Sequence, residues 1–563
     1  MTSNTMSDRT PRPPAAARAD WWRDAVIYEV YVRSFADADG DGTGDLGGVR
    51  SKLGYLEELG VDALWFAPWY PSPLADGGYD VADYRAVNPA FGDLAEAEAL
   101  IREALDRGIR TIVDIVPNHV SSEHPWFRAA LASEPGSPER DRFWFRPGRG
   151  AHGELPPTDW VSNFGGPTWT RTTNPDGTPG EWYLHLFAPE QPDLNWDNPE
   201  IRREHEDILR FWFDRGVAGV RIDSAALLVK DPRLPEVPAN PGPGEHPNTD
   251  RDELHDIYRS WRAIADGYAA TDGHGDRVLV GEIWLPDTAR FAKYLRPDEM
   301  HTAFNFDFMA RPWSATELRE SITSMLAAHA PVGAPSTWVL SNHDVTRPVT
   351  RYGRADTAFA FAAKRFDTPT DLRLGTRRAR AAALLSAALP GSLYIYQGDE
   401  LGLPEVEDIP RELLTDPMFS RSHGVDPGRD GCRVPLPWAG DRPPYGFGAA
   451  SAWLPQPADW SGLTVEAQER DPRSMLSLYR AALRVRKTLP AADAVDWLAG
   501  PPDVLAFARD GLLNVTNFGS APVALPAHNG VLLSSSPLDG DGDGDGDGGL
   551  LPGDATVWLR PIP

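Results

Sequence analysis

The stretch from 217 to 230, VAGVRIDSAALLVK, places an arginine and an aspartate at the end of a short apolar segment. Val217 and Ile222 suit a buried β-strand, and the neighbouring glycines let the backbone pack closely. Side chains two residues apart in a strand point to the same side, so Arg221 and Asp223 are expected to be neighbours. A carboxylate beside a guanidinium stays ionised and keeps a fixed orientation, as a nucleophile must. A structural ion pair is the alternative interpretation.

Charge and composition exclude several classes of partner. The chain has 55 Lys and Arg residues against 82 Asp and Glu residues, a net charge of −27, which disfavours nucleic acid and anionic membranes. The single cysteine, Cys432, excludes an internal disulfide framework. No apolar run reaches the roughly 18 residues of a membrane span, and residues 1–20 lack the apolar core of a signal peptide. We expect a disordered tail over 1–20 and a cytoplasmic protein with a small-molecule partner; the sequence leaves monomer and homodimer open.

One module recurs along the chain: an amphipathic helix, a glycine, a short apolar strand and a polar residue. Helical spacing of apolar residues over 49–59 stops at Gly60, and an apolar strand follows. Asn198 and Pro199 form a good helix start, and that helix ends at Gly216, where the opening strand begins.

Eight strands are expected in this way. They cover residues 26–32, 61–67, 109–116, 217–222, 278–283, 301–306, 336–340 and 392–396. Strands alternating with helices form a parallel sheet, and eight of them predict an α/β fold, the (β/α)8 TIM barrel, with its chemistry at the carboxyl ends of the strands. Those ends carry clusters of polar side chains: Asp76 and Tyr79, Asn118 and His119, Arg221 and Asp223, Glu282, and Asn342, His343 and Asp344.

Two regions depart from this module. Residues 120–195 are rich in Trp, Pro and Gly and too long for an ordinary loop, which predicts a small domain inserted after strand three. From residue 491 onwards short alternating strands, including 504–509 and 513–518, predict a C-terminal antiparallel β domain over 491–563. The barrel is then expected to comprise 21–119 and 196–490. The Asp-Gly repeat at 539–548 is interpreted as a flexible loop without assigned function.

Four segments resemble the signature regions of glycoside hydrolase family 13, the α-amylase family. They are Asp114-Ile-Val-Pro-Asn-His119, Gly219-Val-Arg-Ile-Asp223, Gly281-Glu-Ile-Trp284 and Ser341-Asn-His-Asp344, in the family's order. Gln191-Pro-Asp-Leu-Asn195 is similar to an extra region of the family's oligo-1,6-glucosidase and α-glucosidase branch. The resemblance extends from about residue 21 to the C terminus and is weakest over the last seventy residues.

The resemblance implies a role for each catalytic carboxyl group. Asp223 would be the nucleophile of a retaining reaction, Glu282 the general acid/base with a raised pKa, and Asp344 the group that binds the 2- and 3-hydroxyls of glucose. Arg221 would remain the partner of Asp223.

The same resemblance implies a substrate pocket. His119 and His343 would donate hydrogen bonds to sugar hydroxyls, although a histidine after a strand is also commonly a packing residue. Asp76 and Arg429 would bind the non-reducing end, with a salt bridge between loops as the alternative. Tyr79 would stack on the sugar ring, and Phe164 would be an aromatic wall from the inserted domain.

A glycine-rich loop, Asp37-Ala-Asp-Gly-Asp-Gly-Thr-Gly-Asp45, places carboxylates at alternate positions, which suits Ca²⁺. The branch that it resembles holds a structural ion here through Asp37, Asp39, Asp41, Asp45 and the Thr43 carbonyl; Mg²⁺ is the alternative ion, and a solvated acidic turn the alternative interpretation. No organic cofactor is expected.

Several activities share this machinery. The residue after the nucleophile is Ser224; in the relatives a valine there accompanies α-1,6 cleavage, and smaller or polar residues accompany α-1,4 cleavage. We therefore expect a retaining exo-α-glucosidase acting on α-1,4 bonds of maltose and short malto-oligosaccharides. The alternatives are an α-glucosyltransferase or sugar isomerase of the trehalose or isomaltulose synthase type, and an oligo-1,6-glucosidase or sucrose hydrolase. A non-enzymatic transporter heavy chain is disfavoured, because such chains have a membrane anchor and lack the carboxylates.

Overall fold

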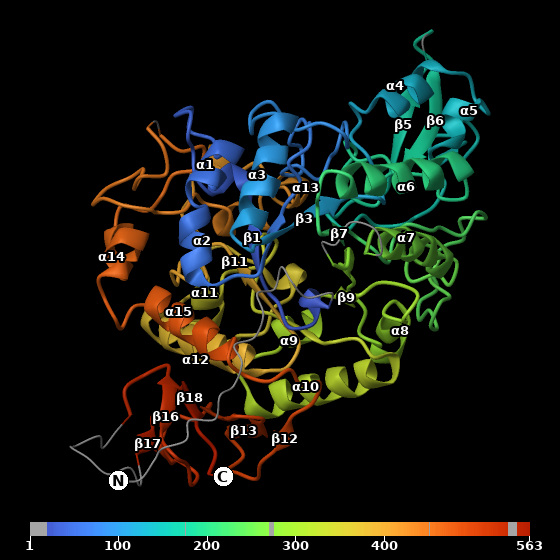
Figure 1. Ribbon diagram of the computed structural model, residues 1–563. Helices are drawn as coiled ribbons and strands as arrows, with labels where there is room; N and C mark the ends of the chain where they lie inside the picture. Colours follow the sequence, from blue (N-terminus) through green and yellow to red (C-terminus); the bar gives the residue numbers. More distant parts are fainter. Residues whose placement is uncertain (1–19, 175, 270–274, 450, 539–548, 563) are drawn as a thin grey trace, which may run out of the picture.

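The computed structural model describes residues 20–174, 176–269, 275–449, 451–538 and 549–562. Eight parallel strands form a nearly closed barrel at its centre (Figure 1). These strands are β1 (Val26–Val30), β2 (Ala63–Phe66), β3 (Arg110–Ile115), β7 (Gly219–Ile222), β8 (Val278–Gly281), β9 (Thr302–Ala303), β10 (Thr337–Val339) and β11 (Ser392–Tyr396). The predicted barrel is confirmed, and seven of its strands are shorter than expected.

The hydrogen-bonded order of the barrel is β10-β11-β1-β2-β3-β7-β8-β9. Its two ends meet through one side chain: the Thr337 hydroxyl on β10 donates to the Ala303 carbonyl on β9 at 2.6 Å and accepts from the Asn305 backbone N–H at 3.0 Å. Every residue of these strands is buried, as expected for a parallel sheet covered on both faces.

Helices follow the strands and surround the barrel (Figure 1). They are α1 (Leu46–Ser51), α2 (Leu53–Leu59), α3 (Leu94–Asp106), α6 (Pro199–Phe213), α7 (Leu254–Ala269), α8 (Thr288–Lys293), α9 (Phe306–Ala310), α10 (Ala315–His329), α11 (Pro348–Tyr352), α12 (Leu372–Ala388), α13 (Pro417–Arg421), α14 (Val465–Glu469) and α15 (Met475–Arg486). As expected, the Asn198 side chain caps α6 by accepting the Glu200 N–H. The helical pattern over 49–59 is divided at Lys52, whose φ of −109° and ψ of 7° interrupt the helix.

Between β3 and α6 the chain leaves the barrel and forms a small three-stranded antiparallel sheet, seen at the upper right of Figure 1. Its strands are β4 (Phe145–Arg146), β5 (Trp169–Thr173) and β6 (Pro179–Leu184), in the order β4-β6-β5. Two short helices, α4 (Pro125–Ala132) and α5 (Pro138–Asp141), accompany it. The sequence indicated little helix here, because each helix is only one or two turns long.

The C-terminal residues form an antiparallel sheet below the barrel, as predicted (Figure 1). Its order is β12 (Asp496–Trp497), β13 (Val504–Arg509), β14 (Leu512–Asn517), β18 (Ala555–Leu559) and β16 (Val531–Ser534), with a separate pair β15 (Val523–Ala524) and β17 (Leu550–Leu551). The Trp558 indole donates to the Leu384 carbonyl of α12 at 3.1 Å, and the Thr556 hydroxyl donates to the Ala381 carbonyl at 2.9 Å. Strand β18 is thereby joined to the outer layer of the barrel.

The boundaries predicted for the three regions stay predictions. The expected loop at 539–548, and the expected tail apart from Asp20, lie outside the described residues. In the part of the chain that the structure describes, no helix combines the length and the apolar character needed to cross a membrane.

Candidate active site

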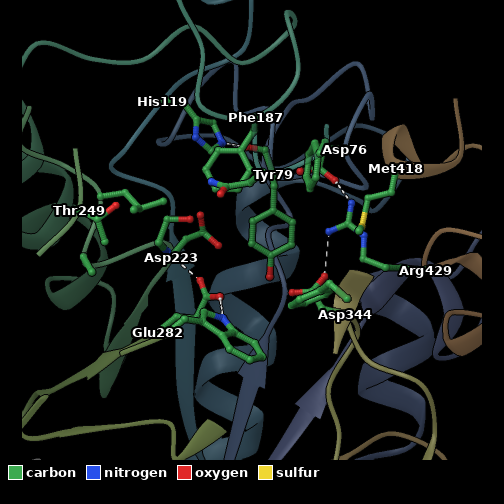
Figure 2. Close-up of a pocket in the computed structure, with 17 residues that line it drawn as sticks. Asp76, Tyr79, His119, Phe187, Asp223, Thr249, Glu282, Asp344, Met418 and Arg429 are labelled. Carbon is green, nitrogen blue, oxygen red and sulfur yellow. Dashed lines mark hydrogen bonds and ion pairs between the residues drawn. The ribbon is translucent and has the colours of Figure 1, made fainter. Parts of the chain in front are cut away.

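A cavity of about 380 Å³ opens at the carboxyl ends of the barrel strands (Figure 2). Side chains from the barrel and its loops, from the inserted region, and from α13 and the loop after it line the cavity: Asp76, Tyr79, His119, Asn163, Phe164, Phe187, Asp223, Ser224, Ala226, Leu227, Thr249, Glu282, Trp284, Asp344, Phe361, Met418 and Arg429. Nine of the eleven predicted catalytic and substrate-binding residues therefore meet in one cavity. The other two, Arg221 and His343, are buried behind its lining. The chemical roles assigned to these residues stay predictions.

Arg221 lies at the centre of three buried carboxyl groups, those of Asp114, Asp223 and Glu282, which together form the charged floor of the cavity. Its Nη1 contacts Asp223 Oδ1 at 2.7 Å and Asp114 at 3.0 Å, and its Nη2 lies 3.0 Å from Glu282 Oε2. The guanidinium is fully buried, so these ion pairs are little screened by water. The sequence predicted one of the three partners; parallel pairing of β3, β7 and β8 brings the other two to the same level of the barrel.

Both carboxyl oxygens of Glu282 accept hydrogen bonds. Oε2 accepts the Ser224 backbone N–H at 2.7 Å, and Oε1 accepts the Trp284 indole N–H at 2.8 Å. Ser224 has a φ of 48°, in the left-handed region that few side chains adopt without strain. This turn aims the Ser224 N–H at one catalytic carboxyl group, Glu282, while its hydroxyl works against the burial that raises the pKa of the other, Asp223.

Burial raises the proton affinity of the carboxyl groups around Arg221. It raises the pKa of Glu282 to about 7, against the opposing charge of Arg221 and with a further increase from Asp223. Burial also raises the pKa of Asp223, opposed by Arg221 and by the Ser224 hydroxyl. Burial raises the pKa of Asp114 to about 8. The floor of the cavity therefore holds a proton near neutral pH, as general-acid chemistry requires.

A second cluster lies across the cavity, around two arginines. Arg429 contacts Asp344 at 2.9 Å, Asp416 at 2.6 Å and also Asp76, and Arg433 contacts Asp344 at 3.0 Å. Burial alone would raise the pKa of Asp344, but the positive charges around it hold that pKa well below its usual range. Figure 2 shows the predicted Asp76–Arg429 ion pair on this side of the cavity.

The two predicted histidines occupy different positions. His119 lines the cavity, and its Nε2 lies 3.1 Å from the Tyr79 carbonyl oxygen. Burial lowers the pKa of His119, so the ring is neutral at pH 7. His343 stacks behind Tyr79 at 5.1 Å between ring centroids, and its Nδ1 pairs with buried Glu29. Contact with a sugar is thus geometrically available to His119 and Tyr79, whereas His343 supports Tyr79 from behind.

The inserted region supplies an aromatic rim. Phe164 and Phe187 meet edge to face at 5.2 Å, and the Arg429 guanidinium lies 4.9 Å from the Phe164 ring centroid. Arg421 of α13 donates to the Gly165 carbonyl at 2.8 Å, which fastens the Phe164 loop to the barrel. Two chain segments far apart in sequence therefore form one rim.

Three of the five predicted metal ligands gather in the acidic loop. Carboxylate oxygens of Asp37, Asp39 and Asp45 all lie within 4.8 Å of one another. Asp41 is exposed and accepts the Thr43 backbone N–H at 2.7 Å. Oxygen donors at this spacing are the ligand type that a hard divalent cation takes, and in this structure the same carboxylates accept backbone N–H groups of the loop.

Several residues of the site were missed by the sequence analysis. They are Asp416, Arg433, Phe187, Thr249, Leu227, Met418 and Phe361, with Trp284 and Asp114 quoted in motifs but given no role. Most lie in irregular loops, where apolar periodicity gives no signal. The Asp416-Pro417 pair, a typical helix start, was the available signal for Asp416, which caps α13.

Two carboxyl groups that meet at the strand ends of a TIM barrel are the arrangement that glycoside hydrolases use. The family model described as "Alpha amylase, catalytic domain" matches residues 29–493. The chain belongs to this α-amylase family, which confirms the resemblance seen in the sequence. An oligo-1,6-glucosidase of Parageobacillus thermoglucosidasius is 34% identical over 503 residues, covering 83% of this chain and 84% of that protein.

Solved structures agree with this assignment. The alpha-glucosyl transfer enzyme XgtA superposes with a TM-score of 0.81 at 34% identity, covering 98% of this chain and 100% of that one. The trehalulose synthase MutB from Pseudomonas mesoacidophila MX-45 superposes with a TM-score of 0.81 at 30% identity, covering 96% of this chain and 100% of that one. Proteins named as an α-glucosyl transfer enzyme and as a trehalulose synthase thus share this fold.

Proposed function

We propose that the protein is a retaining exo-α-glucosidase that releases terminal α-1,4-linked glucose from maltose and short malto-oligosaccharides. One observation carries the proposal: Asp223 and Glu282 share the Arg221 guanidinium beneath a cavity that the Asp76–Arg429 pair closes. Retention needs two carboxyl groups about 5–5.5 Å apart, and attachment to one guanidinium favours such close spacing. A closed wall admits a terminal sugar and excludes an internal one.

The reaction proceeds in two displacements. Asp223 attacks the anomeric carbon while Glu282 gives its proton to the leaving oxygen, which departs as an alcohol and leaves a β-glucosyl-enzyme. Glu282, now ionised, takes a proton from water; the water oxygen bonds to the anomeric carbon, and the bond to Asp223 breaks. The product is α-glucose. The ionised Asp344 accepts hydrogen bonds from the 2- and 3-hydroxyls.

The linkage preference rests on Ser224. In the relatives that the sequence resembles, smaller or polar residues at this position accompany α-1,4 cleavage, and this chain has a serine there. A panel of maltose, maltotriose, isomaltose, sucrose, trehalose and an aryl α-glucoside tests this, with anomer detection by NMR. We expect maltose and maltotriose to be hydrolysed fastest with α-glucose as the first product. Initial release of β-glucose would overturn retention, and faster cleavage of isomaltose would overturn the linkage.

Glucosyl transfer is the second candidate. The superposition of XgtA and MutB over nearly the whole chain favours it, as do the apolar side chains of Leu227, Phe361 and Met418 in the cavity lining, since an apolar surface holds water weakly. Incubation with concentrated maltose separates the two activities, because transfer forms longer or rearranged sugars while hydrolysis forms glucose alone.

We further propose that Asp37, Asp39 and Asp45 hold a structural Ca²⁺, with Asp41 and the Thr43 carbonyl completing the set. The loop follows β1 and lies outside the cavity lining, so the ion would stabilise the fold without taking part in the chemistry. Calorimetry tests this: EDTA should lower the melting temperature, Ca²⁺ should restore it, and Mg²⁺ should restore less. An unchanged melting temperature would reject the site.

A further inference from the structure

Trp284 connects the acid/base carboxyl group with the wall of the cavity. Its indole N–H donates to Glu282 Oε1 at 2.8 Å, and 38% of the residue remains exposed at the cavity lining. The Trp284 ring stacks on Phe306, the first residue of α9, at 3.9 Å with an interplanar angle of 4°. The Phe361 ring meets it at 5.3 Å. These contacts fix the direction of the N–H.

The two oxygens of Glu282 have unequal surroundings. Oε2 accepts the Ser224 N–H and faces the Arg221 Nη2, so a donor and a cation already occupy its side. A proton on Oε2 would meet both, which is unfavourable. Oε1 accepts a single N–H, that of Trp284, and has one lone pair remaining. Oε1 is therefore the oxygen that carries the transferable proton.

We propose that Trp284 is a positioning residue for this proton. Its N–H occupies one lone pair of Glu282 Oε1 and leaves the other for the O–H bond directed at the leaving oxygen. In the first displacement that O–H proton moves to the leaving oxygen, the electrons of the breaking glycosidic bond go to the same oxygen, and Asp223 supplies the new bond to carbon. The inference rests on the proposed function, whose acid/base it concerns.

The indole N–H also influences when Glu282 ionises. A donated hydrogen bond stabilises the carboxylate, so it works against the burial that raises the pKa of this group. The other charges that face Glu282 are Arg221 and Asp223 from the end of β7 and Asp344 from the loop after β10. All three remain when the indole is replaced, which makes the contribution of Trp284 separable.

Trp284→Phe is the discriminating variant, because it keeps an aromatic ring against Phe306 while it removes the N–H together with one ring of the indole. We expect kcat/KM for maltose to fall about tenfold, the usual weight of a hydrogen bond to a charged group. For α-glucosyl fluoride, whose leaving group needs little protonation, we expect a change of less than about threefold. The basic limb of the kcat/KM profile for maltose should move up by about one pH unit, because loss of the donor raises the pKa of Glu282.

Phe361→Leu is the matched control. It alters the same wall without touching Glu282, so KM for maltose should rise while the basic limb stays in place. Far-UV circular dichroism and the melting temperature check that both variants are folded. Equal losses for maltose and α-glucosyl fluoride, or an unmoved basic limb in Trp284→Phe, would overturn the inference. A wild-type protein that turns over no α-glucoside would instead overturn the proposed function.

Discussion

Two groups of carboxylates face each other across the cavity, and they are held in opposite ways. On the floor, Asp114, Asp223 and Glu282 share the guanidinium of Arg221. On the opposite wall, Asp76, Asp344 and Asp416 contact two guanidinium groups, those of Arg429 and Arg433. Residue types and burial are alike on the two sides; the number of arginines differs.

This difference decides which carboxyl groups hold a proton and which stay ionised. With one cation for three acids, burial dominates on the floor, and the pKa of Glu282 rises to about 7. On the wall, His343 together with Arg429 and Arg433 outweighs burial at Asp344, and the two arginines outweigh burial at Asp416, so both pKa values fall below their usual range. One side can donate a proton while the other remains ionised to bind hydroxyl groups, so the cationic partners on each side decide which carboxyl groups stay ionised.

Removal of the nucleophile should have the largest effect on the floor. Asp223→Ala is expected to lower kcat by about 10⁴-fold or more while leaving circular dichroism unchanged. Added azide tests the assignment with an activated aryl glucoside: Asp223→Ala should form β-glucosyl azide by direct attack, whereas Glu282→Ala should form the α-azide from the intermediate. The opposite pattern would exchange the two roles.

Removal of one arginine from the wall should make it resemble the floor. Arg429→Ala leaves three buried carboxylates with Arg433 alone, an imbalance worth about 3–5 kcal/mol, and we expect kcat/KM for maltose to fall about 100-fold, mainly through KM. The acid limb of the profile should move to higher pH as the pKa of Asp344 rises. Arg421→Ala, which removes a rim arginine bonded to a carbonyl, is the control and should cost far less.

The protonated floor predicts the pH dependence of the wild-type enzyme. Glu282 must be protonated in the first displacement, so kcat/KM should fall about tenfold per pH unit as pH rises above about 7. Glu282→Gln should remove this basic limb together with most of the activity towards maltose. A basic limb that persists in Glu282→Gln would assign the ionisation to another group.

The smallest expected effect concerns the turn that connects the two catalytic carboxyl groups. Ser224→Val places a β-branched residue at a φ of 48° and removes the hydroxyl beside Asp223, so we expect a loss of about 1–3 kcal/mol in the free energy of unfolding. Ser224→Gly, which accepts this φ, is the control in urea denaturation. Equal stability of the two variants would show that the backbone relaxes at no cost.

Most of the floor could be predicted from sequence, because Arg221, Asp223 and Glu282 lie at strand ends within short motifs, whereas Asp114 lies inside β3 and was given no role. Arg221 and Asp223 lie two residues apart, and the pairing of parallel strands carries Asp114 and Glu282 to their level. Strand periodicity alone is enough to place such residues together.

Much of the wall could not be predicted, since it depends on loops without periodicity. The Asp76–Arg429 pair came from the resemblance, and Asp416 went unnoticed because no repeat pattern relates it to a strand. Close contacts of the backbone outside the site were not predicted either. A Cβ at Gly48 would lie 2.0 Å from the Ala36 carbonyl oxygen, and the helical spacing of apolar residues over 49–59 gives no sign of this contact.

Asp76 and Arg429, the pair that closes the cavity, are separated by 353 positions in the chain. During synthesis, all three carboxyl groups of the floor are present once residue 282 has been added. Arg429 of the wall is added nearly 150 residues later. A growing chain therefore acquires its reactive groups well before it can hold a sugar against them. Ligand binding consequently reports completion of the barrel, and a bound inhibitor should slow proteolysis of both distant loops together.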